Sequence, residues 1–536
     1  MLRRLSVFVL LLLITLGSGC TRQPRQPGTL RLATTTDPST LDPAHAYDTT
    51  SINYARVLYR GLVDYDEGAN IVNIVARERE VSPDGKTYRF KLRPDVHFHY
   101  APDGSRPGRR VVAEDFRYAL ERVLTPATAS DGFALYKIID GAEEFSTGKS
   151  PHVHGIRVLG DDEIAFTLTN PDATFLNLLT LPFAYAVSRE TVEALEKQGK
   201  TLSENPNGTG PFLLDEWRHD AWVRLKKNPD YFDRNLPKSE RIELEIGGDE
   251  TLHLMRFELG DLDIIGDIPA PDFVRLTHDP KWKPYIQHAP MMDIRYVSLN
   301  NELEPFNNVE VRRAMNYAIN RERIATFLNR RVTLARGALP PGMPGYNPRL
   351  FQYSYDPEKA KQLLKQAGYG DGFTVTLWVP TTESWYPKAA QSIKQDLKNI
   401  GVTVNIKLVT YPELKTKAGK RKELKMAMIG WLQDYPDPSN FLDILFNGRK
   451  ITETASNNRA FYSNPQVNEL LKAAAVQTNR DRRLKLYQEA EKLIVADAPW
   501  VFLHHNERYV ISQPWVTGYK LHPMWSARYE YVGVQQ

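Results

Sequence analysis

Residues 373–379 read Phe-Thr-Val-Thr-Leu-Trp-Val, and residues 402–409 read Val-Thr-Val-Asn-Ile-Lys-Leu-Val. Both stretches are rich in the β-branched and aromatic residues that favour strands. The residues between them, near 387–399, have the spacing of apolar side chains that is typical of a helix. We therefore predict a strand-helix-strand unit. With a further strand predicted at 424–429, this unit indicates an α/β domain with a mixed or parallel sheet.

Helix-end residues extend this domain along the chain. Asp356 and Pro357 are typical of the start of a helix, and Gly368 is typical of its end. A leucine- and alanine-rich stretch at 463–496 predicts a pair of helices. Residues 286–500 are therefore expected to belong to one α/β domain.

The N-terminal half carries shorter strand patterns separated by turn signals. Residues 86–98 begin with alternating apolar and basic side chains, and residues 156–168 are typical of a hairpin. Further short strands are predicted at 30–33, 242–246 and 262–265.

Composition narrows the classes of protein to which the chain can belong. Its 536 residues predict roughly three or four domains or lobes. A hydrophobic fraction of 42% and a charged fraction of 25% are typical of globular proteins. The net charge of +4 is spread along the chain, which argues against nucleic-acid binding. The single cysteine, Cys20, excludes a disulfide framework and a cysteine-based zinc site.

The N-terminus has the three parts of a secretory signal. Two arginines precede an apolar run over residues 5–16, and small residues follow it. The run is shorter than the roughly 20 residues that a membrane-spanning helix needs, so we expect residues 1–19 to be removed. Cys20 would then be the first residue, which resembles the lipid-attachment site of bacterial lipoproteins, although Gly17 stands where leucine is usual. Ordinary signal cleavage without lipidation is the alternative.

The residues that follow the predicted signal are polar and rich in proline. This composition gives residues 20–27 no hydrophobic pattern to bury, so we predict a tether, lipidated at Cys20.

The strand predicted at 424–429 is followed by a candidate ligand site. Ligands of open α/β sheets bind beyond the carboxyl ends of strands, where Trp431, Asp434 and Tyr435 stand. These residue types offer an aromatic wall and a carboxylate. A structural role is the alternative, because a tryptophan at a strand end is usually core and residues 434–438 have the composition of a turn.

Seven short segments, taken in order, resemble the solute-binding lipoproteins of peptide ABC transporters, the oligopeptide- and dipeptide-binding family. The resemblance extends from about residue 28 to the C-terminus. The segments include Gly-Thr-Gly-Pro-Phe at 208–212, and the others are Ser-Thr-Leu-Asp-Pro at 39–43, Leu-Tyr-Arg-Gly-Leu at 58–62, and the stretches 91–98, 113–116, 305–314 and 355–360.

The resemblance implies an α/β fold with two lobes, like the type II fold of periplasmic binding proteins. It also implies an additional subdomain and mixed sheets. Lobe I would comprise residues 28–67, 187–285 and 508–536. The appended subdomain would cover residues 68–186, and lobe II residues 286–507.

The resemblance also implies roles for individual residues. In that family an aspartate three residues after the strand-end tryptophan receives the α-ammonium of a peptide, and here this residue is Asp434 after Trp431. Trp431 would wall the pocket, with Tyr435 beside it. Gly266 and Asp267 fall where the family offers peptide contacts from the other lobe.

Two positions depart from the oligopeptide binders. Met428 stands where they have an arginine near the ligand, and Tyr47 stands where they have a glutamate. Both positions are expected to contact the peptide beyond its first residue. The length of the peptide, and even whether the ligand is a peptide, therefore stay open.

The resemblance implies an extracytoplasmic solute-binding component of an ABC importer. It would capture short peptides between its lobes and deliver them to separate permease and ATPase chains. We expect a monomer in the periplasm or at the cell surface, held to a bacterial membrane by its lipid anchor, with no cofactor, no resident metal and no catalytic residue.

Two alternatives concern other ligands and other chemistry. A nickel or other metal complex could be the solute, because histidines are paired at 97 and 99, at 152 and 154, and at 504 and 505. A secreted hydrolase is the alternative of another class, but the HExxH, GxSxG and Ser-x-x-Lys motifs are missing from the sequence.

Overall fold

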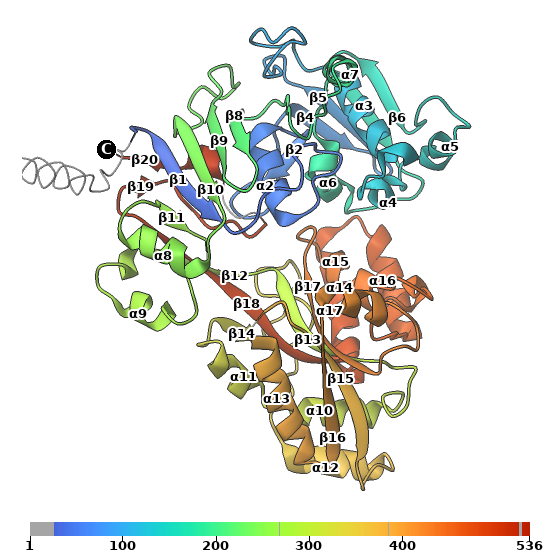
Figure 1. Ribbon diagram of the computed structural model, residues 1–536. Coiled ribbons are helices and arrows are strands. Elements are labelled where there is room, and N and C mark those ends of the chain that lie inside the picture. The colour runs from blue at the N-terminus through green and yellow to red at the C-terminus, as the bar shows by residue number, and fades with distance from the viewer. Residues whose placement is uncertain (1–25, 267, 384, 525–527, 536) are drawn as a thin grey trace, which may run out of the picture.

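The chain forms two lobes, and one long strand, β18 (Trp500–Ser512), runs through both (Figure 1). This computed structural model describes residues 26–266, 268–383, 385–524 and 528–535. The predicted signal sequence and Cys20 lie outside the described residues. None of the helices in the described parts of the chain is both long and apolar enough to cross a bilayer.

The sheet of lobe I contains four strands in the order β1-β10-β9-β8. β1 and β10 are parallel, and the other pairs are antiparallel. Helix α2 (Thr49–Leu58) begins at Asp48, whose side chain accepts a hydrogen bond from the Ser51 amide. Its Tyr54 and Val57 are buried in the core of lobe I. The strands are β1 (Thr29–Thr34), β8 (Phe212–Arg218), β9 (Trp222–Lys227) and β10 (Arg241–Ile246).

Smaller elements complete this part of the chain. They are β2 (Val63–Tyr65), β3 (Ile71–Asn73), α7 (Arg189–Lys197), α8 (Glu250–Glu258), β11 (Ile264–Ile265) and α9 (Phe273–His278), with β19 (Val516–Thr517) and β20 (Gly533–Val534) at the C-terminal end. The strand predicted at 262–265 is therefore shorter than expected.

An antiparallel sheet in the order β4-β5-β7-β6 lies within the segment predicted as the appended subdomain. The expected hairpin forms between β6 and β7, whereas the strand expected at 86–98 ends earlier, before Pro94, which has no amide hydrogen to donate to a ladder. The elements are β4 (Ala76–Val81), β5 (Thr87–Leu92), α3 (Ala113–Leu124), α4 (Phe133–Tyr136), α5 (Ala142–Ser146), β6 (Ile156–Gly160), β7 (Glu163–Thr167) and α6 (Phe175–Leu178).

Lobe II contains the predicted strand-helix-strand unit. β15 (Phe373–Pro380) and β16 (Val402–Val409) pair in parallel, with helix α13 (Trp385–Lys398) between them. β17 (Met426–Leu432) is parallel to β15 but antiparallel to β13 (Asp293–Leu299), so the sheet is mixed. The surrounding elements are α10 (Val309–Ala318), α11 (Arg321–Phe327), β14 (Val332–Leu334), α12 (Pro357–Gln366), α14 (Tyr411–Ala418), α15 (Ser439–Phe446), α16 (Pro465–Val476) and α17 (Arg480–Asp497).

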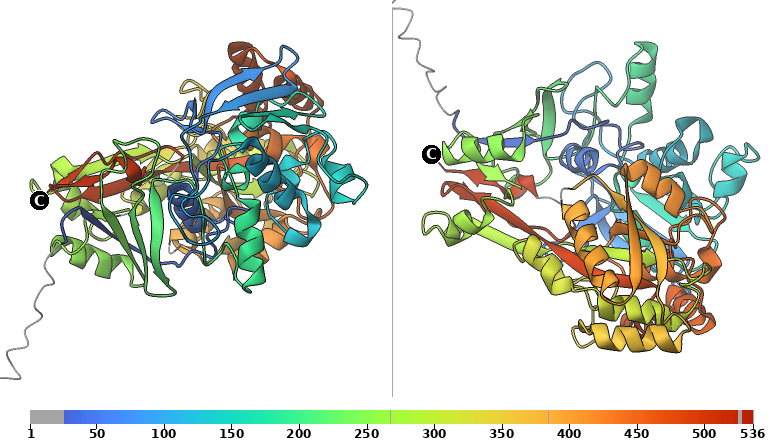
Figure 2. Two further views of the ribbon diagram at one scale, coloured as in Figure 1. Left: turned by 90° about the horizontal axis from the view of Figure 1, so that it is seen from above. Right: turned by 60° about the horizontal axis from the view of Figure 1, so that its bottom comes forward.

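Strand β18 connects the two lobes within one ladder. Its first half pairs with β13 in lobe II, and its second half pairs with β12 (Ile286–Pro290) and β11. The long strand is visible in Figure 2, where its red ribbon crosses from one lobe to the other. The β2-β3 pair crosses the predicted boundary at residue 67, and β18 crosses the one at residue 507, so the segment boundaries stay predictions.

A buried carboxyl group in lobe II leads to a prediction about pH. Glu491, on α17, is almost fully buried, and its Oε1 accepts a hydrogen bond from the Leu339 amide at 2.8 Å. Burial raises the pKa of Glu491 to about 7, so the native state favours the protonated form. The stabilisation from this protonated group is complete below the pKa of the unfolded chain and is lost as the pH rises to about 7.

We expect Glu491→Gln to raise the free energy of unfolding by about 1–2 kcal/mol at about pH 8, less than the full shift implies because the new amide needs an acceptor. At about pH 4 the variant and the parent should differ little, because both side chains are then uncharged. Urea unfolding at the two pH values measures this, and an equal gain at both would contradict the assignment.

Candidate functional site

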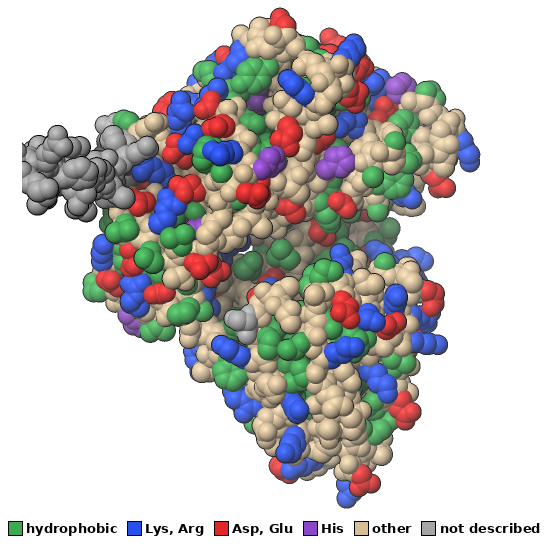
Figure 3. Space-filling model, in the orientation of Figure 1, with side chains coloured by type: hydrophobic (Ala, Val, Ile, Leu, Met, Phe, Trp, Pro, Cys, Tyr) green, Lys and Arg blue, Asp and Glu red, His purple; other side chains and the backbone are tan. Residues whose placement is uncertain are grey.

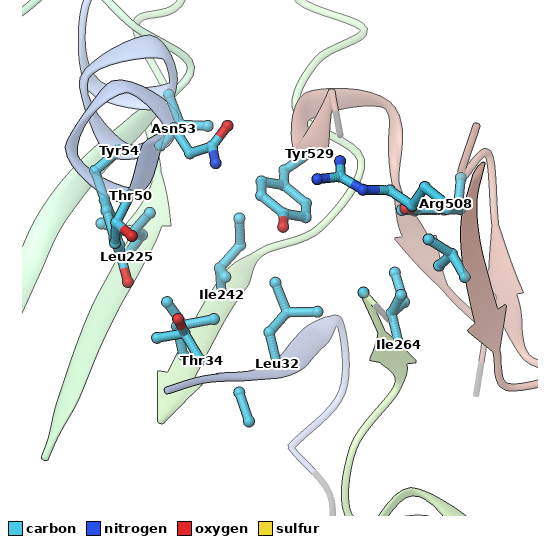
Figure 4. A pocket seen from close by; sticks show the side chains of 16 residues that line it. Leu32, Thr34, Thr50, Asn53, Tyr54, Leu225, Ile242, Ile264, Arg508 and Tyr529 are labelled. Carbon is cyan, nitrogen blue, oxygen red and sulfur yellow. The ribbon is translucent and has the colours of Figure 1, made fainter. Parts of the chain in front are cut away.

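Two adjacent cavities open where lobe I faces lobe II. The first, called the Asp434 cavity, has a volume of about 280 Å³ and is lined by both lobes, including Tyr47, Asn53, Met292, Asp434 and Arg508. The second, called the lobe I cavity, has a volume of about 230 Å³. Figure 3 shows the hollow between the lobes, with hydrophobic side chains in its depth. Asn53 and Arg508, which are labelled in the view of the lobe I cavity in Figure 4, line both cavities, so the two are neighbours.

The end of β17 places Asp434 at the cavity wall. β17 continues to Leu432, so Trp431 lies within the strand and not after it as predicted. The next residue, Gln433, donates its backbone N–H to the Met292 carbonyl at 3.1 Å, and its side-chain amide donates to the Pro523 carbonyl at 3.0 Å. Pro523 belongs to the C-terminal segment of lobe I, so this contact joins the lobes beside the cavity.

The Asp434 carboxylate is held by two neutral donors. Tyr47 Oη, from lobe I, donates to Oδ1 at 3.1 Å, and Asn440 Nδ2 donates to Oδ2 at 3.0 Å. Burial and the neighbouring Asp434 charge both raise the pKa of Tyr47, so its phenol keeps the proton that it donates. The contact between Tyr47 and Asp434 spans the cleft.

The electrostatics of Asp434 favour a cationic ligand. Burial raises the pKa of its carboxyl group, and the hydrogen bonds from Asn440 and Tyr47 oppose this rise only in part. Within the described part of the chain no lysine, arginine or histidine forms an ion pair with Asp434. A half-buried carboxylate that faces a cavity without a counter-ion gains most from a ligand that carries an ammonium group.

Asn440 connects Trp431 to Asp434. Its Oδ1 accepts hydrogen bonds from the Trp431 indole N–H at 3.0 Å and from the Asp434 backbone N–H at 3.1 Å. Trp431 itself lines neither cavity and packs against the core of lobe II. The predicted role of Trp431 as a pocket wall is therefore replaced by a positioning role, exerted through Asn440.

The turn after Asp434 is built around a buried ion pair. Arg483 donates to both carboxylate oxygens of Asp437, at 2.6 and 2.7 Å. Asp437 Oδ1 also accepts from the Ser439 amide at 3.0 Å, and its carbonyl accepts from the Asn440 amide at 3.0 Å. Asp437 thereby holds the chain segment that carries Asn440.

Tyr435, the third residue predicted at the end of β17, lines neither cavity. Its side chain is buried and packs in a cluster of apolar residues that belong mainly to the appended subdomain. It therefore contacts the opposite side of the cleft and not the cavity. Its role is to join lobe II to that subdomain.

The remaining predicted positions differ in whether they line a cavity. Gly266 lines the lobe I cavity, whereas Asp267 lies outside the described residues. Met428 is fully buried in the core of lobe II and lines neither cavity, so the expectation that it contacts a peptide is wrong for this conformation. Tyr47 lines the Asp434 cavity, and its contact with a peptide beyond the first residue stays a prediction.

The histidine pairs do not assemble into a ligand set. His99 and His505 are buried and contact backbone carbonyls of Gly210 and Asp293, at 3.0 and 2.6 Å. His152 is exposed and contacts Glu121 at 3.1 Å. Over the described residues, no group of three or more histidine, cysteine or acidic side chains lies close enough to share a metal ion.

Three residues of the site were missed by the sequence analysis. No motif or local spacing in the sequence connects these residues to Asp434. They are Asn440, Asn53 and Arg508. Only the fold brings residues 47 and 508 to the same cavity as residue 434.

Comparison with known proteins adds relatives that extend over nearly the whole chain. The model of bacterial extracellular solute-binding proteins, family 5 (middle region), matches residues 70–453. Heme-binding protein A of Haemophilus influenzae is 31% identical over 497 residues, which is 91% of this chain and 88% of the relative. The dipeptide-binding protein of Escherichia coli K12 is 30% identical over 500 residues, with 91% and 90% covered.

A solved structure shares the same two-lobed architecture. The ABC transporter-associated periplasmic binding protein DppA from Helicobacter pylori, in complex with the peptide STSA, superposes with a TM-score of 0.76 at 30% identity. The superposition covers 96% of this chain and 99% of that one. Relatives, matched region and fold agree, and the chain belongs to the bacterial extracellular solute-binding proteins of family 5.

Proposed function

We propose that this protein captures short peptides between its two lobes, as the extracytoplasmic solute-binding component of an ABC importer. The observation that carries the proposal is the Asp434 carboxylate, which faces a cavity between the lobes and has no counter-ion among the described residues. The α-ammonium of a peptide would supply that charge. A charge-assisted hydrogen bond of this kind contributes about 1.5–3 kcal/mol.

The surroundings of Asp434 suit a peptide head group. Tyr47 and Asn440 each occupy one carboxylate oxygen, which fixes the orientation of the carboxylate toward the cavity. A peptide held in an extended conformation can satisfy its amides against protein backbone, so affinity need not depend on every side chain. The names of the relatives from Escherichia coli and Helicobacter pylori, which refer to a dipeptide and a bound peptide, support the same ligand class.

The proposal extends to the setting in which the protein works. Peptide binding between the lobes would shift a hinge equilibrium toward a closed form that separate permease and ATPase chains recognise. The proposal includes lipidation at Cys20, a monomeric state and attachment to a bacterial membrane. Mass spectrometry of the mature N-terminus would reveal the lipid directly.

The ligand class can be tested on purified mature protein. We expect a pool of di- to pentapeptides to raise the melting temperature and to change tryptophan fluorescence, because ligand that binds only the native state stabilises it. Nickel salts, glutathione and hemin serve as competing ligands, the last two chosen from the names of relatives. A response to metal salt alone would favour the metal-complex alternative, and peptide hydrolysis that survives repurification would favour the hydrolase. Either result would contradict the proposal.

A further inference from the structure

Helix α8 carries apolar side chains on two opposite faces. Leu254 and Phe257 are buried in a core that α8 shares with β11 and α9. Leu252, Met255 and Leu259, which we call the α8 stripe, are 45%, 56% and 65% exposed. Residues three and four apart share one face of a helix, so these side chains form one line along the outside of α8. A helix with apolar side chains on both faces is usually covered on both.

The surroundings of the α8 stripe favour an apolar partner over a charged one. The two charged residues within the stripe, Arg256 and Glu258, are both held in ion pairs, Arg256 with Glu245 and Glu258 with Arg275 of α9 at 2.7 Å. The second pair places α9 beside α8, and Val274 of α9 adds another exposed apolar side chain, at 54%. Exposed apolar side chains that gather on one face are typical of an interaction surface.

The α8 stripe lies near the point where the chain enters lobe I. The segment after α8 binds directly to β1, because the Asp263 amide donates to the Arg31 carbonyl at 2.9 Å and the Arg31 amide donates to Asp263 Oδ2 at 2.8 Å. Arg31 is the third residue of β1. In Figure 1, α8 and α9 accordingly lie at the edge of lobe I where β1 begins.

A lipid on Cys20 would keep this edge of lobe I close to a membrane. Cys20 stands eight residues before Gly28, and eight residues span at most about 26–29 Å. The predicted tether between them is polar and rich in proline, so it offers no apolar cover for the α8 stripe. The bilayer that holds the lipid does offer such cover, within the reach of the tether.

We propose that the α8 stripe is a second membrane contact, which places its apolar side chains in the surface of a phospholipid bilayer beside the Cys20 anchor. This inference rests on the lipid attachment that the proposed function includes. Three partly exposed side chains of this size that leave water should strengthen partition into the membrane by at least about tenfold. Since the stripe belongs to lobe I alone, the contact would hold lobe I at the membrane and leave lobe II free to move.

Vesicle flotation of a singly acylated protein tests this proposal. The chain has one cysteine, so a maleimide that carries one myristoyl chain couples to the mature protein only at Cys20. One myristoyl chain gives weak, reversible binding, so a second contact changes the bound fraction. On phosphatidylcholine vesicles the unaltered chain should partition at least about tenfold more strongly than the stripe variant, which carries Leu252→Gln, Met255→Gln and Leu259→Gln. Equal partition would overturn the proposal.

A matched control replaces three similarly exposed apolar residues outside lobe I. Phe351, Leu408 and Val476 are 52–55% exposed. Their triple glutamine variant should partition like the unaltered chain, and a loss as large as that of the stripe variant would contradict a contact confined to α8.

Two measurements on the unaltered protein need no variant to fold. Amide hydrogen exchange in α8 of the acylated protein should slow when vesicles are added, and unchanged exchange would overturn the proposal. Sedimentation without vesicles should show a monomer, whereas a dimer that the stripe variant loses would assign the stripe to a second copy of the chain and overturn the membrane contact.

Peptide titration of the same protein keeps the two proposals apart. If peptides bind while the stripe variant partitions like the unaltered chain, the proposed function survives and only this inference fails. If the stripe strengthens partition while no peptide binds, the membrane contact stands and the proposed ligand class fails.

Discussion

Asp437→Ala is expected to lower the free energy of unfolding by about 3–5 kcal/mol, the cost of leaving one partner of a buried ion pair alone. Arg483 and Asp437 are both nearly buried, with side-chain exposures of 8% and 10%, and they share two short hydrogen bonds. The loss of the Asp437 side chain leaves the guanidinium without a carboxylate and removes the acceptor of the Ser439 amide, whereas the Asn440 amide keeps its bond to the backbone carbonyl of residue 437. Urea unfolding, followed by circular dichroism, measures the change.

A double variant separates the unpaired charge from the loss of packing. Replacing both partners, as in Asp437→Leu with Arg483→Met, should recover a large part of the stability, because neither residue then leaves a buried charge unsatisfied. A single variant with unchanged stability would contradict the account of the turn. In a folded Asp437→Ala protein we also expect weaker peptide binding, because the turn that carries Asn440 beside Asp434 would lose the ion pair to Arg483 and the hydrogen bond to the Ser439 amide.

Asp434→Asn is expected to weaken peptide binding by about 1.5–3 kcal/mol, which is about tenfold to 150-fold. Asparagine keeps the size of the side chain and an oxygen that can accept from Tyr47, but it removes the charge that the ammonium needs. The control is Asp481→Asn. Asp481 is an exposed aspartate in the first turn of α17, and it does not line the Asp434 cavity. An unchanged affinity in Asp434→Asn would mean that the ammonium is held elsewhere.

The same residue gives peptide binding a defined pH dependence. Burial raises the pKa of Asp434 in the unliganded protein, and a bound ammonium would lower it again. Affinity should therefore stay constant above that raised pKa and fall as the pH decreases through it, with proton uptake on ligand release. Asp434→Asn should abolish this dependence. The variant should also melt at a higher temperature without ligand at neutral pH, because the charged form of a group with a raised pKa destabilises the native state.

The sequence predicts local structure well where the signal itself is local. β15, α13 and β16 follow from the spacing of apolar residues over fewer than forty positions, and Asp356 with Pro357 begins α12 as expected. The two-lobed fold required the resemblance to a family, because β18 pairs with strands more than 200 residues away. The spacing of apolar residues along the chain does not show which distant strands pair.

The site was predicted less completely than the fold, for a physical reason. Asp434 could be proposed from the sequence because it follows a strand end, where ligands of α/β sheets bind. Tyr47 and Arg508 reach the cavity from lobe I and from β18, so only the folded chain brings them to Asp434. Trp431 has the residue type of a pocket wall, but its indole N–H points to Asn440, and a strand-end position alone does not distinguish the two orientations.

The central claim is that the Asp434 carboxylate receives the ammonium group of a peptide. Calorimetric titration with Ala-Leu and with its N-acetylated form tests this most directly, since the two ligands differ only in the charge at that end. The account predicts that acetylation weakens binding by at least about tenfold and that the difference disappears in Asp434→Asn. Equal affinity of the two ligands for the unaltered protein would contradict the claim.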